Sequence, residues 1–74
     1  MNNEITQIIR AANELISEGS TGGCTSEQIA AAFVLNQLCF IPAGYDMVQA
    51  WERIEAWQGY VKIIKSHYMH LINR

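Results

Sequence analysis

An apolar repeat with alternating steps of three and four residues runs through the C-terminal half of this chain. It is free of proline, and its positions form four heptads of a and d residues, a pattern that predicts one amphipathic α-helix. Asp46 stands just before the repeat as an N-cap, and Gln49 follows it with capping-box spacing. The repeat consists of Met47, Ala50, Ile54, Trp57, Val61, Ile64, Tyr68 and Leu71.

The helix predicted over residues 46–72, with Asp46 as its cap, would be about 39 Å long from Met47 to Ile72 at about 1.5 Å per residue. The rest of the chain is too short to cover such a stripe, so we expect the helix to form a homodimer. Gly59 is a weak point because glycine is a poor helix former, and the sequence does not decide whether the helix breaks there. The residues expected at a protein interface are Trp51, Ile54, Trp57, Tyr60, Val61, Ile64, Tyr68 and Leu71.

Two shorter helices precede the long one. Residues 4–18 carry isoleucines, alanine and leucine at helical spacing on one face, with Asn3 as N-cap and Gly19 suited to a left-handed C-terminus. Residues 25–39 begin with Thr25 and Gln28 at capping-box spacing and continue into a run that is apolar on every side. A helix that is apolar all round is a buried one. We therefore predict a single all-α domain over residues 1–74, in which two shorter helices pack on one long C-terminal amphipathic helix.

Composition limits the classes of protein to which the chain can belong. Seventy-four residues are near the lower size limit for independent stability, and oligomerisation is a common remedy. The longest apolar run, Ile29–Leu35, is far shorter than the roughly 20 residues that span a bilayer. The N-terminus lacks the features of a secretion signal, so we expect a cytoplasmic protein with no membrane segment. Cys24 and Cys39 are then expected to be reduced, with Cys39 a small core residue.

Charge is unevenly distributed along the chain. Residues 1–59 carry a balance of −5, whereas residues 60–74 carry +3, giving the net charge of −2. Two interpretations are open for the basic end. In the first, which we favour, the basic residues complement the negative C-terminal end of the helix dipole. In the second, they dock an acidic partner or nucleic acid. The possible anionic-partner patch consists of Lys62, Lys65, His67, His70 and Arg74.

No motif predicts catalysis, a metal or a cofactor. His67 and His70 can share a helix face, but a metal site needs three or four ligands and no acidic residue lies near them. The glycine-rich residues 19–23 lack the lysine and the strand of a phosphate-binding loop. Cys24 would need a histidine base to act as a nucleophile. We therefore expect a protein that is not an enzyme and that binds neither metal nor cofactor.

The expected function is protein–protein interaction, as a small adaptor, regulator or inhibitor acting as a homodimer. The alternative is a DNA-binding regulator, because residues 25–31 resemble the first helix of a helix-turn-helix motif. Binding to DNA requires donors that reach bases and phosphates, yet no lysine or arginine occurs between Arg10 and Arg53. Only Arg53 and Gln49 would serve near the start of a recognition helix. Nucleic acid is thus possible but disfavoured, and the identity of a protein partner is not encoded in any motif.

Overall fold

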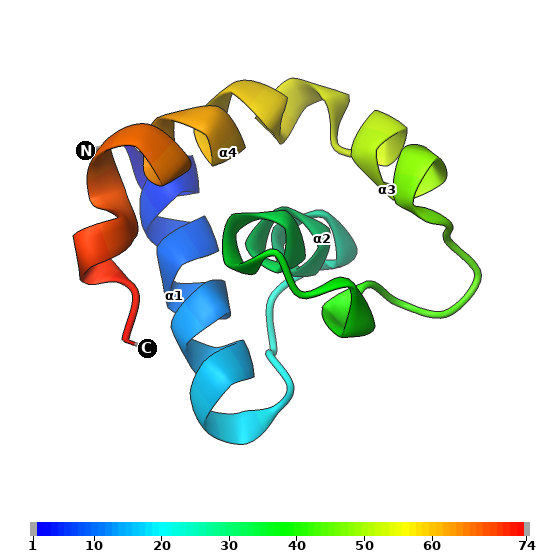
Figure 1. Ribbon diagram of the computed structural model, residues 1–74, viewed down its shortest axis with the longest axis horizontal. Coiled ribbons are helices and arrows are strands. Elements are labelled where there is room, and N and C mark those ends of the chain that lie inside the picture. The colour runs from blue at the N-terminus through cyan, green and yellow to red at the C-terminus, as the bar shows by residue number, and fades with distance from the viewer. Residues whose placement is uncertain (1, 74) are drawn as a thin grey trace.

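A computed structural model describes residues 2–73, and in this part of the chain all regular structure is helical. The four α-helices are α1 (Asn3–Glu18), α2 (Thr25–Leu35), α3 (Met47–Arg53) and α4 (Gln58–Ile63). The predicted all-α class is confirmed. Helix α2 lies at the centre with α1 on one side, and the chain from α3 onward arches over α2 and ends beside α1 (Figure 1).

Helix α1 forms largely as its pattern predicts. Its apolar face is buried through Ile5, Ile8 and Leu15, among others. Gly19 ends the helix with φ 76°, the left-handed conformation that glycine adopts without steric cost. The N-cap is Asn2 rather than Asn3, since the Asn2 side chain accepts the N–H of Ile5 at 2.9 Å.

Helix α2 is the buried centre that its composition predicts. All three of its alanines are inaccessible to solvent, and small side chains there let α1 and the arch approach the α2 backbone closely. The helix ends at Leu35, not at residue 39, because Asn36 adopts a left-handed conformation with φ 56°. The predicted capping box is also wrong. Cys24 is the N-cap without a side-chain bond, and the Gln28 amide donates instead to the Phe40 carbonyl at 2.8 Å.

The prediction of one continuous helix over residues 46–72 is wrong. Helix α3 begins as expected, with the Asp46–Gln49 capping box in place. It ends at Arg53, and Ile54 leaves the helical region with φ −96° and ψ 30°. The chain continues through the 3₁₀ turn η2 (Glu55–Trp57), α4, the π-helical turn η3 (Ile64–Tyr68) and the 3₁₀ turn η4 (Met69–Leu71). Gly59 lies inside α4, so the break is not at the glycine.

Burial explains why this segment bends. A straight helix of about 39 Å would extend beyond α2, whose eleven residues span about 17 Å. The bend at Ile54 lets both halves of the apolar repeat contact α2, and Ile54 itself becomes 1% exposed. The carbonyl of Trp51 that the break leaves without a helical partner accepts the Gln58 side-chain amide at 2.8 Å. The longest extent of the molecule is 30 Å, shorter than the straight helix.

Candidate functional site

An apolar groove lies where α3, α4 and the C-terminal end of α2 meet. Its volume is about 410 Å³. None of its lining residues is acidic, and two are lysines. We call it the α3/α4 groove and define it by Phe33, Asn36, Met47, Val48, Trp51, Val61, Lys62 and Lys65.

The apolar part of the groove is built on an aromatic pair. The rings of Phe33 and Trp51 meet edge to face, with centroids 5.0 Å apart and an interplanar angle of 72°. Beside them, Met47 is 53% exposed and Val48 is 66% exposed. Contiguous exposed apolar side chains on a soluble monomer often mark an interaction site. The first turn of α3 therefore presents apolar surface that the chain does not cover.

The two lysines of the groove have different roles. The ammonium group of Lys65 donates to the Phe33 carbonyl at 3.0 Å and to the Asn36 side-chain oxygen. Lys65 thus caps the C-terminus of α2, where a cation also complements the helix dipole. Lys62 lies in the last turn of α4 and is exposed, and within residues 2–73 its ammonium group has no hydrogen bond or ion pair.

The predicted interface residues do not form one surface. Ile54, Val61 and Ile64 are at most 2% exposed and belong to the core of the single chain, and of the three only Val61 also lines the groove. Their assignment to an interface stays a prediction. Trp51 lines the groove. The others are the half-buried Trp57, Tyr60 and Tyr68, which pack against the core, and the exposed Leu71.

The predicted anionic-partner patch is also divided. Lys62 and Lys65 reach the groove, but His67 and His70 do not line it. Both histidines instead flank the Tyr68 ring, with centroid separations of 6.4 and 6.3 Å. Arg74 lies outside the described residues. Only the two lysines therefore combine with apolar surface.

Sequence reasoning missed four of the groove residues as parts of a site. Phe33 was assigned to the buried centre of the second helix and Met47 to the dimer stripe but not to the expected interface, whereas Asn36 and Val48 were assigned to no site. Val48 carried a usable signal, because it adds an apolar side chain beside the a position occupied by Met47, on what a coiled coil would leave as a wet face. The extra apolar residue beside Met47 was thus visible in the sequence, but the exposure of the two side chains became known only from the structure.

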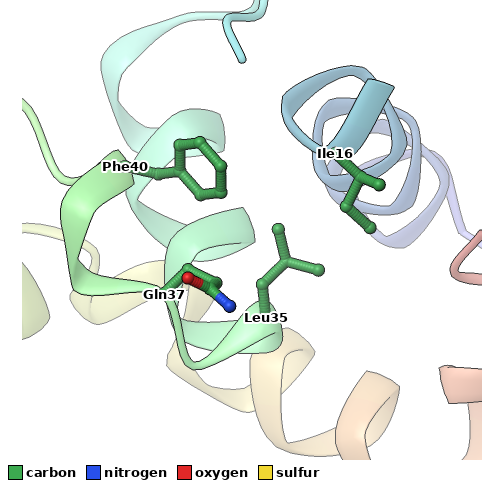
Figure 2. A pocket seen from close by; sticks show the side chains of 4 residues that line it. All are labelled: Ile16, Leu35, Gln37 and Phe40. Carbon is green, nitrogen blue, oxygen red and sulfur yellow. The ribbon is translucent and has the colours of Figure 1, made fainter. Parts of the chain in front are cut away.

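A second hollow, of about 400 Å³, lies between the C-terminal ends of α1 and α2. Figure 2 shows Ile16 from α1, Leu35 from α2 and Phe40 from the 3₁₀ turn η1 (Leu38–Phe40) around this space, with the Gln37 amide beside them. No charged side chain lines it. It offers apolar contact and one polar side chain, the Gln37 amide.

The residues considered for metal binding, cysteine chemistry and DNA recognition lie elsewhere in residues 2–73. No group of three His, Cys, Asp or Glu residues in that range is placed to hold a metal ion. Cys24 and Cys39 are free and exposed, so the expectation that Cys39 lies in the core is wrong. The residues considered for DNA recognition are engaged locally: Gln49 accepts the Asp46 N–H at 3.1 Å, and the Arg53 guanidinium stands over the Tyr45 ring at 5.9 Å.

None of the helices within the described range has the length and apolar character needed to cross a membrane. No protein family model matches the sequence, and comparisons with curated proteins and with solved structures found no significant match. The α3/α4 groove is therefore the candidate site, on its own geometry.

Proposed function

We propose that this protein is a non-enzymatic interaction protein, an adaptor, regulator or inhibitor that binds another protein through the α3/α4 groove. The observation that carries the proposal is the exposure of Met47 and Val48 beside the Phe33–Trp51 pair. Tryptophan is enriched among residues that dominate binding energy. Fully burying a valine or methionine side chain contributes about 1.5–3 kcal/mol, so a partner that covers this ridge gains part of that free energy from each of the two residues.

Homodimerisation remains a prediction, and its physical basis has changed. The sequence argument required a long uncovered stripe, whereas Ile54, Val61 and Ile64 are covered within one chain. A two-fold dimer uses the same patch on both copies. Two grooves meeting in this way would bring four lysine side chains together, from Lys62 and Lys65 of each copy. This repulsion favours a different protein over a second copy as the occupant of the groove.

The variant Val48→Glu tests the proposal. A carboxylate on the apolar ridge must lose water when a partner covers it, so we expect loss of the partner with the fold intact. Leu38→Glu is the matched control, because Leu38 is 51% exposed and lies outside the groove. Tagged wild-type, Val48→Glu and Leu38→Glu proteins would be used to capture proteins from an extract of the source cells.

The proposal is supported if wild type and Leu38→Glu capture the same protein in equal amount and Val48→Glu does not capture it. Captured proteins that are insensitive to Val48→Glu would show that the groove is not the interaction surface. Light scattering on the free proteins addresses the second copy. A mass of twice 8.4 kDa in wild type that falls to 8.4 kDa in Val48→Glu would assign the groove to self-association instead.

A further inference from the structure

We infer that the α3/α4 groove receives an amphipathic helix whose apolar face is flanked by acidic side chains. This inference rests on the proposed function and specifies the chemistry of the partner. It follows from the placement of charge around the groove, from the kind of backbone that lines it, and from the state of the two lysines.

Charge in the groove is one-sided. The apolar ridge of Met47 and Val48 comes from α3, whereas Lys62 and Lys65 come from α4 and η3. With no acidic residue among the lining side chains, the cations are not neutralised by carboxylates within the groove. The first 59 residues carry a balance of −5, so an acidic partner is repelled elsewhere on the chain and attracted here. Electrostatic complementarity of this kind directs a partner to one site and one orientation.

The groove accepts a helix rather than an extended strand. Its walls are helical, and residues 2–73 contain no strand whose free edge would pair with an incoming one. A helix that docks in a groove presents apolar residues at i, i+3, i+4 and i+7 along one face. Acidic residues on the flank of that face would lie over Lys62 while the apolar residues contact Val48 and Trp51.

The two lysines contribute unequally to this recognition. Two of the three ammonium donors of Lys65 are directed to the end of α2, and its charge is partly balanced by the helix dipole there. The Lys62 ammonium group makes no such bond within residues 2–73, so its donors are available to a partner. Charge reversal at Lys62 therefore tests recognition without removing the α2 cap, whereas reversal at Lys65 would disturb both.

Synthetic helical peptides of about 15 residues provide the probe, since shorter helices are marginal in water. The first peptide carries a leucine stripe flanked by glutamate, and the second has lysine in place of every glutamate. Binding to the full chain would be measured by fluorescence anisotropy at 50 mM and 500 mM salt. We expect the acidic peptide to bind at least tenfold more tightly than the basic one at low salt, and this advantage to shrink several-fold at high salt.

Three variants complete the experiment. Lys62→Glu should weaken the acidic peptide about fivefold, in line with reversal of one exposed charge contact. Arg10→Glu is the matched control, because Arg10 is exposed on α1 and does not line the groove, and it should leave the affinity unchanged. Val48→Glu should abolish binding of both peptides.

Equal binding of the two peptides, or an affinity unchanged by Lys62→Glu, would overturn the acidic-helix inference. Absence of any binding of the acidic peptide at 1 mM would overturn it as well. Neither result bears on the proposed function, which stands as long as a natural partner is captured in a Val48-dependent manner and falls if it is not.

Discussion

Replacing Ala31 by glutamate is expected to leave the protein unfolded at 25 °C. Ala31 is inaccessible to solvent at the centre of α2, and no buried polar or charged residue lies near it, since the core of residues 2–73 contains none. An unpaired carboxylate there costs several kcal/mol. The core of a domain this small supplies only about 3–5 kcal/mol of net stability. Far-ultraviolet circular dichroism and urea titration would measure the loss.

Ala43→Glu is the matched control for this change. It makes the same substitution at an exposed alanine in the loop before α3, and we expect stability within about 0.5 kcal/mol of wild type. If Ala31→Glu retained wild-type helicity and a wild-type urea midpoint, α2 would not occupy the centre of the molecule.

Adjacent isoleucines at the end of α4 are expected to respond very differently to truncation. Ile64 is inaccessible, whereas Ile63 is 40% exposed. Ile64→Ala should lower the free energy of unfolding by about 2–5 kcal/mol, because it removes packed methyl groups and leaves a cavity. Ile63→Ala should have a much smaller effect, under about 1 kcal/mol. Chemical denaturation of both variants gives the two values under identical conditions.

The effect of Ile64→Ala also distinguishes a core residue from a dimer contact. If Ile64 packs within one chain, the urea midpoint should not depend on protein concentration. If it packs against a second copy, stability becomes inseparable from concentration. A urea midpoint that rises with protein concentration in wild type, and that no longer does so in Ile64→Ala, would show that Ile64 packs against a second copy. That result would contradict the bent conformation in which Ile64 is buried within one chain.

Several features that are determined locally were predicted well from the sequence, although the Asn3 N-cap and the capping box at Thr25 and Gln28 were not. Gly19 ends α1 because glycine adopts its left-handed conformation without cost, and Asp46 starts α3 through a capping box whose two bonds join residues three apart. The alanine-rich run of α2 is buried because no face of it is polar. In each case the physical cause lies within a few residues of its effect.

The bend at Ile54 was not predictable in this way. A repeat of three and four residues specifies which side chains face inward, but not what they face. Ile54, Val61 and Ile64 satisfy the pattern equally on a straight helix in a dimer and on a bent segment around α2. The choice depends on the length of α2 and on the long-range contacts that the bend creates, and neither is encoded in the periodicity.

The candidate site was only partly predictable for the same reason. Lys62 and Lys65 were identified by charge and Trp51 by its aromatic character. Phe33 joins them from a segment 18 residues before Trp51 in the sequence, and its position against the Trp51 ring depends on the tertiary fold. His67 and His70, close to the lysines in sequence, take no part in the groove.

The most direct test of the groove as a binding site uses the two tryptophans as internal reporters. Trp51 lines the groove and Trp57 does not. Each gives one indole N–H resonance in a ¹H–¹⁵N spectrum, which Trp57→Phe would assign. Titration with the acidic helical peptide should shift the Trp51 resonance progressively and leave that of Trp57 in place. A shift confined to Trp57, or no shift of either resonance at saturating peptide, would contradict the groove as the interaction site.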